Sequence, residues 1–489
     1  MLDMNYATIG QLQQAYREGS LTVKEVVLGH LARIAKIDSP EDGLKSVIEV
    51  NPDALFTAEA LDRQWRETKK MPPLFGIPVL VKDNIGTSGK MRTSAASVAL
   101  SDNYTYDAPI VSDIIEAGGV ILGKANMTEF ANYMTRDGMP NGYSSRGGQT
   151  LCPYNRGKDP SGSSSGSAVA VAAGLSTVSL GTETSGSIVA PAAANGVVGI
   201  KPTIGLVSRS NVIPISSTFD TPGPMARNVT DAAILLGLLT GQDYSDEATK
   251  TLRCPMDWEG EGRPDLMDYS KYLTGDNLQG IRIGLNLTKE LESLKDDPDA
   301  IANFESLCQT LKSAGAVLID NLDMDPKFGV RMTIMQHEFK ACMNHYLRGR
   351  ITRSKQMRCL EDIIQYNQSN AAIALKYGQT LLTDAQNKVS GNLTEPAYLE
   401  ALAKREKSII EMDCLFEANN LDVLLGDHFV YIAPYTGHPS MTIPTGQRKE
   451  CKMPLHASLT ARRQDEGKML QVAYIMEKLL GVSIQPEVG

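Results

Sequence analysis

Three polar groups in the first half of the chain are of the types that attack on an amide carbonyl requires. Residues 161–167 read SGSSSGS, residues 181–187 read GTETSGS, and Lys82 follows an apolar run further upstream. Breaking an amide needs a nucleophile, a base that takes its proton, and hydrogen-bond donors for the oxyanion that forms. Hydroxyls, an amine and a glycine-containing turn supply all three without a histidine, so the sequence predicts acyl transfer by serines and a lysine.

Lys82 can act as a base only if it loses its proton near neutral pH. An exposed lysine has a pKa of about 10.4 and stays charged, whereas burial disfavours the ammonium and lowers the pKa. Residues 77–81 read IPVLV, a strand-length apolar run that leads into Lys82. Burial of this amine is therefore expected, but a strand-end lysine paired with Asp83 explains the local sequence equally well.

The Ser/Gly run at 161–167 admits several interpretations. A flexible linker is disfavoured because the run leads at once into the Ala/Val-rich, helical segment 168–173. A phosphate-binding loop requires Lys and then Ser or Thr after its second glycine, and Gly166 is followed by Ser-Ala. Neither alternative fits the run well.

A nucleophile elbow is a further interpretation of the same run. Residues 162–166 satisfy G-x-S-x-G, with Ser164 as the nucleophile of an esterase of the α/β-hydrolase type. That motif needs a buried strand before it, and the two prolines of segment 152–160 argue against one. It also needs a downstream histidine, for which the candidates are His428, His438 and His456.

The interpretation that uses both serine segments places Ser187 at the start of a helix. Strand-like residues 175–180 lead to a turn at 184–187, and a helix that begins near Ile188 accommodates Pro191 in its first turn. Main-chain N–H groups converge at such a turn and favour negative charge. Ser187 is therefore expected beside donors of the kind that form an oxyanion hole.

Short apolar segments of strand length alternate with helical patterns through most of the chain. Strands are expected at 77–81, 118–123, 176–180, 281–285, 316–319 and 423–425, and helices at 7–36 (a hairpin), 111–117, 168–173, 231–239 and 301–311. This β–α–β alternation predicts an α/β fold with a mostly parallel, covered sheet. Residues 330–420 are rich in helix formers and are expected to form a helical insertion or cap.

Composition excludes several classes of protein. The 489 residues carry a formal net charge of −9, with 42% hydrophobic and 21% charged residues, which argues against a general nucleic-acid binder. Seven scattered cysteines without a C-x-x-C pair favour a reducing compartment over a disulfide framework or a zinc site. The N-terminus lacks a signal-peptide pattern, and no run approaches the roughly 18 apolar residues of a membrane span. A cytoplasmic protein with no membrane or nucleic-acid partner is expected.

Several segments together resemble the amidase signature family. They are 76–84 (GIPVLVKDN), 123–131 (GKANMTEFA), 161–174, 181–194, 199–207 (GIKPTIGLV), 220–227 (DTPGPMAR) and 437–444 (GHPSMTIP). The resemblance covers most of the chain and is strongest over 70–240. It implies one amidase domain over residues 1–489, with a signature core at 70–240 and with the 330–420 helices shaping the substrate pocket. It also implies a mostly parallel, twisted and mixed central β-sheet covered by helices on both faces.

The resemblance assigns catalytic roles residue by residue. It implies that Lys82 is the base, that Ser163 follows a cis peptide bond and relays protons, and that Ser187 is the nucleophile that carries the acyl group. The separation of Ser163 from Ser187 agrees with the family's spacing. No metal or other cofactor is implied. The implied oxyanion hole consists of N–H groups of Thr184, Ser185, Gly186 and Ser187.

Three further residues lie in or beside these blocks. Met127 is a candidate substrate-binding residue, although core packing explains it as well. Glu183 is expected either to organise the turn by accepting main-chain N–H bonds or to be a surface carboxylate. Asp220 is expected to be structural rather than catalytic.

The chain departs from the family's pattern at small residues around the site. Ser161, Ser165 and Ser185 stand where the family often has glycine, so the backbone must accept a Cβ there. Ile188 follows the nucleophile, and the arginine that is frequent soon after it in glutamine-using transamidation subunits is absent. The pattern is more similar to free-standing bacterial amidases, including those that act on peptide C-terminal amides.

The expected activity is hydrolysis of a carboxylic acid amide to an acid and ammonia or an amine. The substrate would be a small-molecule or peptide amide, and the enzyme a monomer or homodimer. An amidase-type subunit of an amidotransferase complex, the esterase that uses Ser164, and a catalytically silent binding protein remain alternatives. The intact set of Lys82, Ser163 and Ser187 argues against the silent protein.

Overall fold

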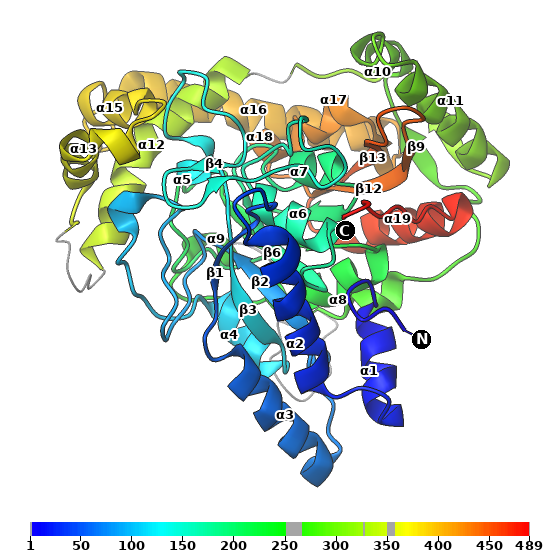
Figure 1. Cartoon of the computed structure of the whole chain (residues 1–489). Coiled ribbons are helices and arrows are strands. Elements are labelled where there is room, and N and C mark those ends of the chain that lie inside the picture. The colour runs from blue at the N-terminus through cyan, green and yellow to red at the C-terminus, as the bar shows by residue number, and fades with distance from the viewer. Residues whose placement is uncertain (1, 251–266, 326–327, 350–356, 489) are drawn as a thin grey trace.

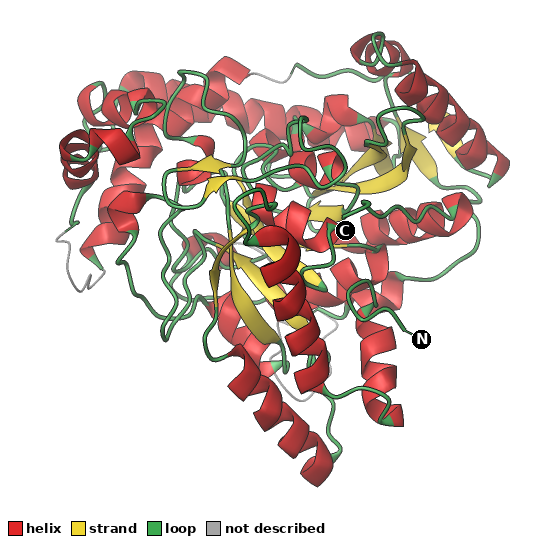
Figure 2. Ribbon diagram, in the orientation of Figure 1, coloured by secondary structure: helices red, strands yellow, loops and turns green. Residues whose placement is uncertain are grey.

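A mixed β-sheet of eleven strands forms the centre of the molecule (Figure 1). The computed structural model describes residues 2–250, 267–325, 328–349 and 357–488. Helices pack around the sheet, and Figure 2 shows the strands enclosed between them. The α/β fold class that the sequence predicts is confirmed.

The order of strands across the sheet differs widely from their order along the chain. Across the sheet the strands are β1 (Val47–Val50), β3 (Val120–Ala125), β2 (Pro78–Lys82), β6 (Val178–Glu183), β8 (Thr221–Ala226), β7 (Val198–Lys201), β12 (Ser440–Gln447), β13 (Pro454–Ala461), β11 (Val423–Leu425), β9 (Arg282–Gly284) and β10 (Val317–Ile319). A separate two-stranded sheet pairs β4 (Tyr143–Ser144) with β5 (Gly148–Gln149).

Parallel pairing occupies two parts of this mixed sheet. Strands β3, β2 and β6 are parallel neighbours, and so are β11, β9 and β10. The strands between β6 and β11 pair antiparallel, as β1 does with β3. All six strands of the parallel parts are expected from the sequence, whereas the antiparallel ones are not. Strand β8 reads TPGPMA, and its two prolines conceal a buried strand from a search for apolar runs.

The register of β2 against β6 decides where Lys82 lies. Val81 pairs with Leu180 in this parallel pair, and every residue of both strands is buried. Parallel strands end at the same edge of a sheet. Lys82 and the end of β6, from Thr182 to Glu183, therefore meet at one edge.

The expected N-terminal helical hairpin is confirmed. Helix α1 (Ile9–Glu18) and helix α2 (Val23–Arg33) each begin with a capping box, formed by Thr8 and by Thr22. Gly19 ends α1 in the left-handed conformation, with φ of 71°, and turns the chain into α2. Helix α3 (Ala54–Thr68) packs on α2 and on β3.

Two groups of helices cover the sheet. Helices α6 (Ser165–Ala172) and α7 (Val189–Ala194) contact each other and the sheet, and both connect directly to the serine segments. Helices α8 (Val229–Leu239) and α19 (Glu466–Leu480) also contact the sheet, and the 3-10 helix η3 (Tyr269–Tyr272) packs on both of them. The remaining helices outside 328–418 are η1 (Ile34–Asp38), η2 (Val98–Leu100), α4 (Pro109–Glu116), α5 (Glu129–Asn132), α9 (Glu247–Lys250), α10 (Leu287–Ser293), α11 (Pro298–Ser313), α17 (Asp427–Val430) and α18 (Ala433–Thr436).

The segment 330–420 is helical, as its composition predicts. Its helices are α12 (Phe328–Arg348), α13 (Leu360–Ser369), α14 (Ala371–Ala374), α15 (Thr380–Asn387) and α16 (Pro396–Ala418). Figure 1 shows α12, α13 and α15 together at one end of the molecule. Their buried side chains form an apolar cluster with Phe130, Tyr133 and Phe219, so these helices are joined to segments close to the signature blocks.

Candidate active site

The amine of Lys82 lies at the end of β2, fully buried, among four oxygen atoms. Its Nζ is 2.9 Å from Ser163 Oγ, 2.8 Å from Ser164 Oγ, 2.9 Å from Thr182 Oγ1 and 3.0 Å from the Thr182 carbonyl oxygen. Burial lowers the pKa of Lys82 to about 7, against the nearby negative charges of Glu183 and Asp220, which raise it. A substantial fraction of the amine is therefore neutral at pH 7.

The structure decides between the two interpretations of Lys82. Asp83 does not pair with it: the Asp83 carboxylate accepts hydrogen bonds from Ser94, Ala96 N–H and Arg146. Lys82 turns to the serines instead. A neutral amine has two N–H donors and one lone pair, so it can donate to two oxygens and accept the hydroxyl proton of a third.

Ser163 follows a cis peptide bond, Gly162–Ser163. Its main-chain carbonyl accepts the N–H of Thr128 at 3.0 Å. Ser164 has a different setting, because its hydroxyl donates to the Thr182 carbonyl at 3.1 Å and accepts the Thr182 N–H at 3.3 Å. Of the two hydroxyls beside Lys82, that of Ser163 is thus the one with fewer competing partners.

The turn after β6 is anchored at both ends by buried carboxylates. Glu183, only 1% exposed, accepts the N–H groups of Ile188 at 2.7 Å and Val189 at 3.1 Å. Thr184 Oγ1 donates to Asp220 at 2.5 Å. Glu183 therefore organises the turn, which is one of the two roles expected for it, and it is not a surface carboxylate. Asp220 makes a structural contact, as the sequence led us to expect.

Within the turn, Gly186 adopts a left-handed conformation with φ of 82°, and Ser187 is 8% exposed. The N–H groups of Ser185, Gly186 and Ser187 donate to no atom of the described residues. The Ser187 hydroxyl likewise has no partner within the described part of the chain, and it makes no hydrogen bond with Ser163 there. The two serine segments are joined by the Ser164 N–H, which donates to the Ser187 carbonyl at 3.2 Å.

The elbow interpretation finds no support in this geometry. Helix α6 begins at Ser165, and the chain before it is a loop rather than a buried strand. Ser164 is bound by Lys82 and Thr182 as described. The three candidate histidines have other partners: His428 contacts Asp323, His438 contacts Asp413 and Thr436, and His456 contacts Asp427.

Thr182 and Asn84 are polar neighbours of Lys82 that reasoning from the sequence missed. Thr182 Oγ1 accepts from both Lys82 and Asn84 Nδ2, the latter at 2.9 Å. Only the pairing of β2 with β6 could have shown this contact. Met127 is fully buried in the apolar cluster with Phe130, an environment that core packing explains.

The described residues also bear on cofactors and cysteines. No group of three or more His, Cys, Asp or Glu residues able to hold a metal ion occurs among them.

Six cysteines are free thiols, and Cys254 lies outside the described residues. In the ranges that the structure describes, no helix has the length and apolar character that crossing a membrane requires.

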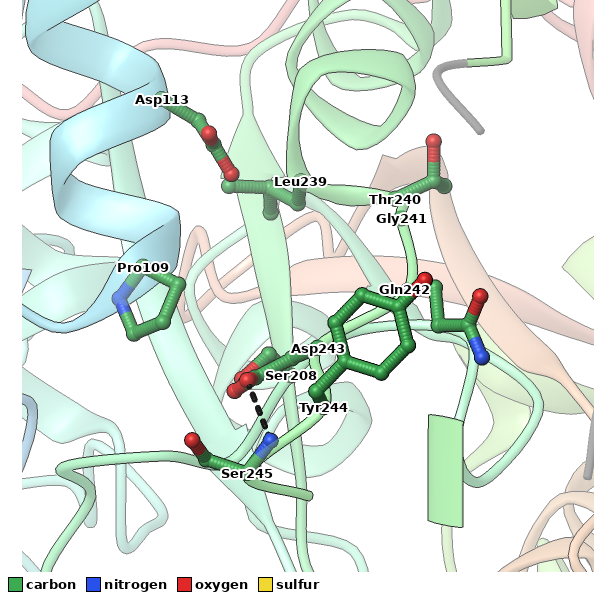
Figure 3. A pocket seen from close by; sticks show the side chains of 10 residues that line it. All are labelled: Pro109, Asp113, Ser208, Leu239, Thr240, Gly241, Gln242, Asp243, Tyr244 and Ser245. Atoms are coloured by element: carbon green, nitrogen blue, oxygen red, sulfur yellow. Dashed lines mark hydrogen bonds between the residues drawn. The ribbon is translucent and has the colours of Figure 1, made fainter. Parts of the chain in front are cut away.

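Three cavities of the described structure have none of Lys82 and its hydrogen-bond partners in their walls. The one in Figure 3, of about 340 Å³, lies between the start of α4 and residues 239–245 and includes none of the residues around Lys82. A second, of about 840 Å³, has Ser161 and Tyr431 in its wall. A third, of about 930 Å³, lies between Asp220 and Cys342 of α12.

Known proteins share this fold and these sequence blocks. The family model described as Amidase matches residues 25–440. The chain therefore belongs to the amidase family, and it is an amide hydrolase. The resemblance to the amidase signature family is confirmed.

Individual relatives cover nearly the whole chain. A probable amidase of Arabidopsis thaliana is 37% identical over 487 residues, which span 96% of this chain and 90% of the relative. The X-ray structure of native peptide amidase from Stenotrophomonas maltophilia is similar with a TM-score of 0.90 and 36% identity, over 99% of this chain and 98% of that one. A glutamyl-tRNA(Gln) amidotransferase subunit of Alkaliphilus metalliredigens is 30% identical over 500 residues, 97% of this chain and 96% of the relative.

Proposed function

We propose that the protein hydrolyses amides through an acyl-enzyme on Ser187, with Ser163 as proton relay and Lys82 as base. One observation carries this proposal: a fully buried amine with a pKa near 7 lies 2.9 Å from the Ser163 hydroxyl. A base of that pKa is well matched to proton transfer at neutral pH. The Ser187 hydroxyl makes no hydrogen bond with the described residues, and catalytic hydrogen bonds often form or tighten only when substrate binds.

The reaction proceeds in two halves. Neutral Lys82 takes the proton of Ser163 while Ser163 takes that of Ser187, and the Ser187 oxygen bonds to the carbonyl carbon of the amide. The C–N bond breaks as the proton returns through Ser163 to the nitrogen, which leaves as ammonia or an amine. Water then attacks the ester by the same proton route, which releases the acid and restores Ser187.

Main-chain N–H groups of residues 184–187 stabilise the oxyanion in both halves. The unpaired N–H groups of Ser185, Gly186 and Ser187 in the described structure support this role, because donors without internal partners are available to a ligand. The bonds of Glu183 to the two residues after the turn support it further, since they hold the donors in place before the substrate arrives.

The proposed substrate is a peptide that carries a C-terminal carboxamide. The likeness to peptide amidase over nearly the whole chain favours this class over small aliphatic amides. In this proposal residues 1–489 form one domain around a 70–240 core, the 330–420 helices shape the acyl pocket, and Met127 is a candidate substrate-binding residue. The cavity of about 930 Å³ between Asp220 and α12 supports a pocket on that side. Free thiols favour a reducing compartment such as the cytoplasm.

Mass spectrometry of the trapped enzyme tests the mechanism. The purified chain is mixed with peptide amides and with aliphatic and aryl amides, ammonia is measured, and acid-quenched samples are digested. We expect fastest release from peptide amides and an acyl group on the peptide that contains Ser187. An acyl group on Ser164, retained in the Ser187→Ala variant, would establish the elbow mechanism instead.

A dependent amidotransferase component is a second candidate, favoured by the likeness to the glutamyl-tRNA(Gln) amidotransferase relative. Size-exclusion chromatography of the purified chain with an ammonia assay across the eluted fractions separates the two. Amide hydrolysis that coelutes with the lone chain, as a monomer or homodimer, supports a free enzyme. Activity that appears only with added partner proteins supports the amidotransferase.

A further inference from the structure

A buried carboxylate joins the helical segment 330–420 to the loop that supports the catalytic turn. Glu338, on α12, is fully buried. It accepts hydrogen bonds from the hydroxyls of Ser216 and Thr218, from the Thr218 N–H at 3.0 Å and from Tyr398 of α16 at 2.8 Å. A carboxylate with four donors is held firmly, and it fixes those donors in return.

The loop that Glu338 binds, residues 215–220, is hydrogen-bonded through Asp220 to the turn that contains the proposed nucleophile. Asp220 Oδ2 accepts the N–H groups of Ile215 at 2.8 Å and Ser216 at 2.9 Å, and Asp220 Oδ1 accepts the Thr184 hydroxyl. Ser216 thus bonds Glu338 through its hydroxyl and Asp220 through its N–H. A continuous chain of hydrogen bonds runs from α12 to the first residue of the turn.

Helix α12 also contacts Tyr431, which lies beside Gly186 of the turn. Arg331, two helical turns before Glu338, donates to the Tyr431 carbonyl at 3.3 Å. The Tyr431 ring lies against Gly186, so close that a Cβ on that glycine would be 3.4 Å from the ring. Helix α12 is therefore linked to the turn at two places, through loop 215–220 and through Tyr431.

We propose that Glu338 is a positioning residue: it holds loop 215–220, and through Asp220 and Thr184 it fixes the oxyanion-binding turn relative to the pocket helices. The inference rests on the proposed function and adds a residue more than 100 positions downstream in sequence that acts on the turn without touching the substrate. Its consequence is geometric. Small displacements of catalytic donors lower the rate of the chemical step more than they lower binding, since donors at the oxyanion act in the transition state.

The test uses Glu338→Gln, which keeps shape and volume but replaces one acceptor oxygen with an N–H₂ group. We expect kcat for a peptide amide to fall about 10- to 100-fold with KM changed less than about 3-fold. The matched control is Asp231→Asn, which alters another buried carboxylate that binds Ile9 N–H and Asn228 far from the turn. We expect it to lower thermal stability and to leave kcat unchanged.

A double-mutant cycle with Thr184→Val separates positioning from general destabilisation. If Glu338 acts through Asp220 and Thr184, the losses in kcat do not add. Additive losses, a normal kcat in folded Glu338→Gln, or a change confined to KM would overturn the proposal. If Glu338→Gln does not fold, Tyr398→Phe replaces it in the cycle, because this variant removes the Tyr398 hydroxyl that donates to Glu338. Mass spectrometry of the parent enzyme is the separate test of the mechanism. If the acyl group is found on Ser187 but Glu338→Gln behaves normally, this inference alone fails.

Discussion

Lys82 and Thr182 lie on neighbouring parallel strands, and two hydrogen bonds join the amine of one to the hydroxyl and carbonyl of the other. These contacts fix the direction of a side chain that has four rotatable bonds, in a site closed to solvent. The other two hydrogen-bond partners of the amine are the hydroxyls of Ser163 and Ser164. In the proposed mechanism this oriented, partly neutral amine takes the place of a histidine as the base that activates a serine.

The pH dependence of catalysis follows from the lowered pKa of Lys82. Protonation removes the lone pair, so kcat/KM is expected to fall tenfold per pH unit below about pH 7 and to level off above it. Steady-state rates between pH 5 and 9 on one peptide amide measure this fall, the acidic limb of the pH–rate profile. Lys201, also fully buried with its pKa lowered to about 8, is the matched control: Lys201→Met should keep the same limb. An unchanged limb in Lys82→Ala would contradict the assignment.

Substitution of the serines distinguishes their roles. Ser187→Ala and Lys82→Ala are each expected to lower kcat by at least about 1,000-fold, because they remove the proposed nucleophile and the proposed base. Ser163→Ala removes the relay and should come close to them. Ser164→Ala is expected to cost only about 10-fold, since Lys82 keeps three of its oxygen partners. Ammonia release measures all four, and full activity in Ser187→Ala would refute the mechanism.

Glu183→Gln changes both the turn and the charge near Lys82. The side-chain oxygen of the introduced glutamine can still accept an N–H bond from the turn, but the turn is held less firmly. A fall in kcat of about 10-fold is therefore expected. Loss of the negative charge, which raises the pKa of Lys82, should also move the acidic limb of the rate profile to lower pH. Glu466→Gln, another buried glutamate that binds a main-chain N–H, should leave that limb in place. A shift to higher pH would contradict this account.

Gly186→Ala tests whether the turn needs a left-handed residue beside Tyr431. The positive φ alone costs about 1–2 kcal/mol of stability for an alanine, and the new Cβ contacts the Tyr431 ring. Gly19→Ala is the control, because Gly19 has a similar φ of 71° with open space around its Cβ position. Both variants should lose similar stability in thermal unfolding. Only Gly186→Ala should also lose about 10-fold in kcat, and equal activities would show that the turn tolerates the change.

The sequence by itself determined the local elements and the candidates for chemistry. The helical spacing of apolar residues indicated the N-terminal hairpin, and the apolar run before Lys82 indicated its strand, because these signals act over a few residues. The family blocks implied that Lys82, Ser163 and Ser187 share one site.

The tertiary structure decided which distant groups meet. Whether Lys82 turns to Asp83 or to the serines depends on the pairing of β2 with β6, and the proline-containing strand β8 is a strand because its neighbours on both sides supply the ladder. The anchoring of Thr184 by Asp220, and of that loop by Glu338, depends on packing between helices and loops far apart in the chain. Such contacts leave no periodic signal in the sequence. They form because a buried polar group must find a hydrogen-bond partner, and tertiary packing decides which partner is near.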